Sequence, residues 1–156
     1  MILCSDKERE ARQMDAAIFT KDEVKARFAA GQHCAQCTLL PWAEELGYDA
    51  EELQRMAAAF GGGMFRGDTC GAVTGALIAL GLVFGDDNAV MEQKTAQFQA
   101  AFRERFGSTI CREILGYDLS QPGALDAARA SGNMTERCPA FVRGASEILQ
   151  DMLKDE

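Results

Sequence analysis

The chain has 156 residues and a formal net charge of −8 at pH 7. This length suits one domain that can bury a core without disulfides or metal for bulk stability. The acidic balance argues against nucleic acid or an anionic membrane as a partner, because proteins that neutralise phosphates carry basic patches. The first 20 residues contain four acidic side chains and no apolar signal segment, so we expect a cytoplasmic protein with reduced thiols.

Helix-start signals recur in the first third of the chain. A capping residue followed three positions later by a carboxylate satisfies the free backbone donors of a first helical turn. Three such pairs are present: Ser5 with Glu8, Thr20 with Glu23, and Asp49 with Glu52. We therefore expect residues 1–20 to form an N-terminal helical extension to a single domain over residues 21–156.

The longest uncharged run covers residues 69–85 and predicts a buried core helix. It is shorter than the ~20 residues that a membrane-spanning helix needs, and four glycines interrupt it. Membrane insertion is therefore not expected. Gly71 and Gly75 begin a row of small residues on this helix, so another backbone or a compact inorganic group can approach it closely.

Two later segments have clear helical periodicity. Phe98, Phe102 and Phe106 recur every four residues within 91–106, which predicts an amphipathic helix with an aromatic core stripe. Residues 141–153 repeat apolar side chains at the same spacing. Alternating β-branched runs are nearly absent, so the sequence predicts an all-α, bundle-like domain of about six to eight helices. Residues 60–69 and 116–133 are expected to be irregular, because the first segment is rich in glycine and the second carries Pro122, Gly123 and Gly132.

Six cysteines are present, and four of them share a sequence context. Glycine or hydroxyl residues precede Cys34, Cys70, Cys111 and Cys138, and Pro139 is a residue favoured at a first helical position. We therefore expect each of the four at or within a turn of a helix N-terminus, where the helix dipole lowers a thiol pKa. Because tens of residues separate them, only the tertiary fold can bring them together. The alternative is that each is a small apolar core residue.

The sequence around these cysteines resembles that of a known family. The stretches "GQHCAQ", "FGGGM", "CGAVTG" and "FGSTICREILG", followed by a late cysteine before an apolar helix, are similar to the C_GCAxxG_C_C family of redox-active proteins. The resemblance covers residues 21–153. It implies a helical domain in which Cys34, Cys70, Cys111 and Cys138 form a redox-active site.

The resemblance also suggests a cofactor. A similar domain accompanies haem in split-Soret cytochromes, where it is thought to hold an iron-sulfur cluster, so we expect a cluster here, with [2Fe-2S] favoured. Four cysteine ligands suit such a cluster. Electron transfer or redox sensing with redox partner proteins follows, as a carrier or accessory protein more than a stand-alone enzyme. A structural zinc site is a further alternative, because four thiolates also suit zinc.

Cys37 departs from the family pattern and makes "HCAQC" a C-x-x-C sequence. This spacing raises a second alternative, a thiol-disulfide oxidoreductase that uses Cys34 with Cys37 or Cys70 and no metal. A core-facing Cys37 is the favoured interpretation. His33, the one histidine, is an accessory candidate that packs or caps more often than it ligates. Cys4 is interpreted as incidental, and we also consider a homodimer through the small-residue helix.

Overall fold

The structure is a computed structural model, which describes residues 18–154. Over this range it contains eight α-helices and two short irregular helical turns, with no strand beyond an isolated bridge between Thr69 and Ile110. The helices are α2 (Lys21–Ala29), α3 (Cys34–Glu45), α4 (Ala50–Met56), α5 (Gly71–Phe84), α6 (Asn88–Phe106), α7 (Cys111–Leu115), α8 (Ala124–Ala130) and α9 (Asn133–Lys154). The predicted all-α fold is confirmed.

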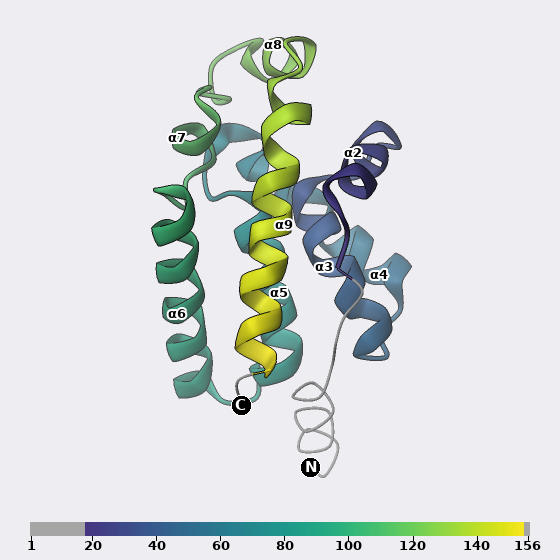
Figure 1. The fold of residues 1–156 in the computed structure, drawn as a ribbon, viewed down its shortest axis with the longest axis vertical. Coiled ribbons are helices and arrows are strands. Elements are labelled where there is room, and N and C mark those ends of the chain that lie inside the picture. Colours follow the sequence, from purple (N-terminus) through teal and green to yellow (C-terminus); the bar gives the residue numbers. More distant parts are fainter. Residues whose placement is uncertain (1–17, 155–156) are drawn as a thin grey trace.

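Three long helices form the body of the molecule. Helices α5, α6 and α9 lie along its long axis, with α9 packed against both of the others (Figure 1). Helices α2, α3 and α4 cover one side, and α3 packs most extensively against α5. The short helices α7 and α8 close one end. Over residues 18–154, no helix has both the length and the apolar character needed to cross a membrane.

The predicted helix starts are present where the structure describes them. The Thr20 hydroxyl accepts a hydrogen bond from the Glu23 N–H at 3.2 Å, and Glu23 Oε2 accepts one from the Thr20 N–H at 2.7 Å. Asp49 Oδ1 accepts a hydrogen bond from the Glu52 N–H at 2.9 Å and begins α4. The pair of Ser5 with Glu8 and residues 1–17 of the helical extension predicted over residues 1–20 lie outside the described residues, and residues 18–20 are not helical.

The aromatic stripe forms part of the core between α6 and α9. Phe98 and Phe102 are fully buried, and the rings of Phe102 and Phe106 are 4.8 Å apart between centroids. Phe106 meets Phe141 of α9 edge to face, with centroids 5.2 Å apart. Such aromatic pairs contribute beyond their buried area. The stripe is therefore structural, as its spacing predicts.

Two predicted boundaries are wrong. Helix α9 begins at Asn133, so Cys138 and Pro139 lie inside it, and the proline does not mark a helix start. The glycine-rich segment 116–133 is only partly irregular, because it contains α8. Gly123 and Gly132, both at positive φ, precede α8 and α9 respectively. The sequence therefore predicted the irregular backbone around these glycines but not the short helix between them.

Candidate functional site

The four family-like cysteines come together at one end of the bundle. Cys34 is the first residue of α3, Cys70 precedes α5, Cys111 is the first residue of α7, and Cys138 lies in the second turn of α9. All four are buried and line one cavity of about 10 Å³. The rest of its wall is apolar apart from one glycine: Gly62, Ile114, Leu115, Met134 and Phe141. Four separate helices thus supply one cluster of sulfurs.

Glycines in α5 allow α3 to approach the site. A Cβ on Gly71 would collide with Cys34 Sγ and with backbone atoms of Phe60 and Ala35. One turn later, a Cβ on Gly75 would collide with the backbone carbonyl of Ala35. Both glycines have ordinary helical backbones, so their role is close approach and not conformational freedom. The predicted approach of another backbone to this helix is present.

Two backbone hydrogen bonds join the segment that precedes Cys70 to the segment that precedes Cys111. The Cys70 N–H donates to the Thr109 carbonyl at 2.8 Å, and the Cys111 N–H donates to the Asp68 carbonyl at 2.6 Å. Arg112 Nη1 reinforces the contact with a 3.1 Å ion pair to Asp68. The segments before α5 and α7 are therefore held side by side, which sets the relative position of these two sulfurs.

The glycine-rich segment forms an unusual left-handed turn beside the sulfurs. Gly62, Gly63, Met64 and Phe65 have φ angles of 57°, 61°, 58° and 58°. A Cβ on Gly63 would collide with the backbone of Asp68 and with Cys111 Cβ. The left-handed conformation costs a non-glycine residue about 1–2 kcal/mol, so Met64 and Phe65 hold strain next to the site. This segment therefore carries backbone close past Cys111.

Burial decides the protonation of these thiols. It raises the pKa of Cys34 and Cys70 above the ordinary thiol value, and that of Cys111 to about 12. The pKa of Cys138 is raised for the same reason. The expectation that helix N-termini lower the thiol pKa is therefore wrong for the free thiols, because desolvation outweighs the dipole. In this form the cysteines are neutral at pH 7.

More backbone N–H groups act on Cys34 than on the other three cysteines, of which Cys70 has one, from Ala72. The backbone N–H groups of Gly62, Ala35 and Gly71 act on its sulfur to oppose the rise in its pKa. After burial, a charge on Cys34 is the next largest influence that raises the pKa of Cys70, Cys111 and Cys138. The four thiols are thus electrostatically coupled, with Cys34 acting on each of the other three.

The accessory candidates lie around the cluster. Cys37 is fully buried, does not line the cavity and has a pKa raised to about 12, first by burial and then by Cys34. The His33 N–H donates to Gln36 Oε1 at 2.8 Å, and its ring meets Phe65 edge on at 5.2 Å. The pKa of His33 is lowered by burial and by Arg129, so the ring is neutral at pH 7. Cys4 lies outside the described residues.

Several residues at the site were not singled out from the sequence. Met134 and Phe141 line the cavity, and Gly62 both lines it and opposes the rise in the pKa of Cys34 through its backbone N–H. The "FGGGM" run was the available signal for Gly62, since consecutive glycines indicate close backbone approach. Met134 and Phe141 carry no such signal, because apolar residues on a helix predict a core equally well.

The donor set fits an iron-sulfur cluster in its chemistry. Four cysteines are the usual ligands of such clusters, and backbone N–H groups aimed at a ligand sulfur tune its potential. In the thiol form the cavity has room for about one water, so the site has to widen before it can hold a cluster. Among residues 18–154, no three His, Cys, Asp or Glu side chains are arranged to hold a single metal ion.

Comparison with known proteins decides the family. The family described as "Putative redox-active protein (C_GCAxxG_C_C)" matches residues 32–152. The chain belongs to this family. The match includes all four cavity cysteines and confirms the family suggested by their sequence context. Searches of curated proteins and of solved structures gave no significant match.

Proposed function

We propose that this member of the C_GCAxxG_C_C family binds an iron-sulfur cluster through Cys34, Cys70, Cys111 and Cys138, for electron transfer or redox sensing. The observation that carries the proposal is the convergence of four buried cysteines, from four helices, on one cavity. A [2Fe-2S] cluster is the favoured cofactor. When bound, it would supply one-electron redox chemistry that the chain's own side chains lack.

The surroundings of the sulfurs support this function. Four neutral buried thiols that lose their protons to a metal centre need compensation for the negative charge. The N–H groups of Gly62, Ala35 and Gly71 provide part of it at Cys34, and Arg112 provides a cation that lowers the pKa of Cys111. Apolar residues on the rest of the wall limit water at the sulfurs, which also affects the potential.

The test is the metal and sulfide content of protein purified without oxygen, together with its visible spectrum. The proposal predicts iron and acid-labile sulfide in equal amounts and a visible charge-transfer band. Bound zinc without sulfide would favour the alternative interpretation of a structural zinc site. A colourless protein that stays free of iron after reconstitution with iron and sulfide would overturn the proposal. We also propose a redox partner protein, a homodimer and a cytoplasmic location.

A further inference from the structure

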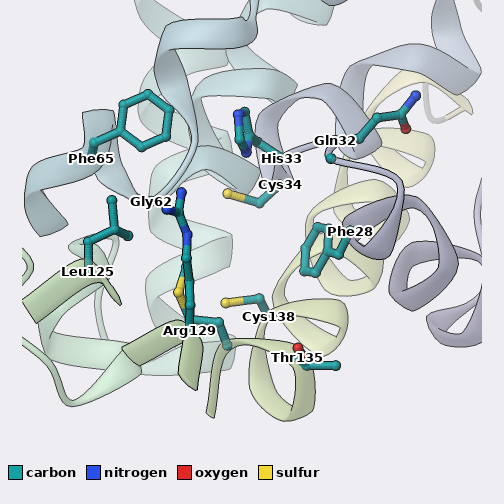
Figure 2. Close-up of a pocket in the computed structure, with 12 residues that line it drawn as sticks. Phe28, Gln32, His33, Cys34, Gly62, Phe65, Leu125, Arg129, Thr135 and Cys138 are labelled. Atoms are coloured by element: carbon teal, nitrogen blue, oxygen red, sulfur yellow. The ribbon is translucent and has the colours of Figure 1, made fainter. Parts of the chain in front are cut away.

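A cleft of about 280 Å³ opens beside the cysteine cavity (Figure 2). It lies where the segment between α2 and α3 meets α8 and the first turns of α9. Its volume is near the lower end of sites that hold small molecules. Phe28 and Phe65 lie on its walls, and the Sγ atoms of Cys34 and Cys138 point into it. A small molecule in the cleft would therefore meet sulfur directly.

The cleft divides the four cysteines into two pairs. Cys34 and Cys138 line both the cleft and the inner cavity, whereas Cys70 and Cys111 line only the cavity. Their exposed fractions follow the same division, at 9% and 8% against 4% and 6%. We call Cys34 and Cys138 the outer pair. A reagent in the cleft reaches the outer pair first.

The cleft combines one cation with apolar walls. Of the described residues that line it, Arg129 is the one with a permanent charge, and its side chain extends across the cleft toward Gly62. Asp126 pairs with Arg129 at 3.7 Å, but both side chains are largely exposed, and exposed pairs of this kind are weak. The guanidinium is thus available to a carboxylate, which arginine binds in a bidentate manner.

We propose that the cleft binds a small organic disulfide that carries an anionic group, with that group on Arg129 and the disulfide against Cys34. Phe28 and Phe65 contact the carbon skeleton between these two ends. The Cys34 sulfur favours a ligand that reacts with thiols, and Arg129 favours a ligand with a negative charge. This activity goes beyond the proposed cluster, because it belongs to the metal-free thiol form, and the two can fail separately.

The exchange step is balanced within the two reactants. Cys34 gives its proton to solvent, and its sulfur attacks one sulfur of the bound disulfide. The ligand S–S bond breaks as the Cys34–S bond forms. The released half leaves as a thiolate and takes up a proton. Cys34 is oxidised to a mixed disulfide, the released half is reduced to a thiol, and the reaction reverses when thiol is in excess.

Three disulfides of similar skeleton provide the test: 3,3′-dithiodipropionate (anionic), 2-hydroxyethyl disulfide (neutral) and cystamine (cationic). Each is added to the reduced, chelator-treated full chain, and peptide mass mapping follows mixed-disulfide formation at every cysteine over time. We expect Cys34 to react first and the anionic probe to react fastest. Cys70, Cys111 and Cys37 should lag, because they do not line the cleft.

Matched arginine variants isolate the recognition. Arg129→Gln should slow the anionic probe at Cys34 by about tenfold, the scale of one lost charge-assisted hydrogen bond, and leave the neutral probe unchanged. Arg129→Lys should recover part of the rate, and Arg103→Gln on α6 should change nothing. Equal rates for all three probes, no effect of Arg129→Gln, or faster reaction at Cys70 or Cys111 would each overturn the proposal.

Discussion

The contact between α3 and α5 differs in kind from the contact between α6 and α9. At the first, Gly71 and Gly75 bring α5 against the backbone of Ala35 and against Cys34 Sγ. At the second, Gly144 of α9 faces the ring of Phe106. A backbone cannot move away from an added methyl group, but a partly buried ring can rotate. The cysteine end is therefore fixed by rigid backbone, and the aromatic end by side chains that can adjust.

Removing an aromatic ring should give the largest loss of stability. Phe102→Ala deletes a fully buried ring between two aromatic neighbours, and we expect a loss of about 3–5 kcal/mol in the free energy of unfolding. Urea unfolding at pH 7 measures it. If the aromatic end is independent of the cysteine end, the folded Phe102→Ala protein keeps the wild-type order in which its thiols react. A loss below about 1 kcal/mol would contradict the assignment of this stripe to the core.

The two glycine contacts can be compared directly by the same substitution. Gly75→Ala should cost about 1–3 kcal/mol, because the new methyl group meets the Ala35 backbone. Gly144→Ala should be nearly neutral, since the helix gains about 0.5–1 kcal/mol from alanine while the Phe106 ring moves. Denaturant unfolding of both variants gives the two values. Equal costs would show that the two contacts are equally rigid.

The buried thiols predict a loss of stability at alkaline pH in the metal-free protein. Their pKa values are raised in the folded chain, so the folded state keeps protons that the unfolded state releases. The contribution is complete below pH 9 and is lost as pH rises toward 12, by up to about 1.4 kcal/mol per pH unit for each thiol. Unfolding at pH 8 to 10 measures the slope.

Cys37 and Cys111 provide the matched variants for this slope. Cys37→Ala and Cys111→Ala should each lower the slope of unfolding free energy against pH by the contribution of one proton, about 1.4 kcal/mol per pH unit. Both thiols have a pKa raised to about 12. Bound metal should remove the contribution of Cys111 but not that of Cys37, which lies outside the cavity. A flat profile in the metal-free wild type would contradict the assignment of neutral, desolvated thiols.

The smallest expected effect is a gain at the left-handed turn. Met64→Gly relieves a positive φ at an exposed side chain, and we expect stabilisation of about 0.5–1 kcal/mol. Met56→Gly is the control, because Met56 is exposed at the end of α4 with an ordinary helical backbone, and glycine there should destabilise by a similar amount. Destabilisation by both substitutions would mean that Met64 holds no strain.

Sequence alone predicted the parts of this molecule that depend on local pattern. The aromatic stripe, the core helix after Cys70 and the caps at Thr20 and Asp49 follow from spacing and capping chemistry, and they are present. The start of α9 was misplaced, because a proline inside a helix looks the same in sequence as a proline at its first position.

The protonation of the site's thiols was harder to predict from sequence than the identity of its four cysteines. The four cysteines were selected by their shared context, and the structure brings them together. Their pKa direction was missed, because helix position can be read from sequence whereas the depth of burial depends on the whole fold. The cleft and Arg129 carry no sequence signal, since α8 and the start of α3 come to line one cleft only in the tertiary structure.

The most direct test of the central claim is the iron and sulfide content of single cysteine variants after anaerobic reconstitution. Cys70→Ser and Cys111→Ser remove sulfurs that line the cavity, and Cys37→Ser removes a buried sulfur that does not. If the four cysteines form one centre, the first two variants lose the cluster or change its spectrum, and Cys37→Ser matches the wild type. Loss of iron from Cys37→Ser with full retention in Cys70→Ser and Cys111→Ser would contradict the account.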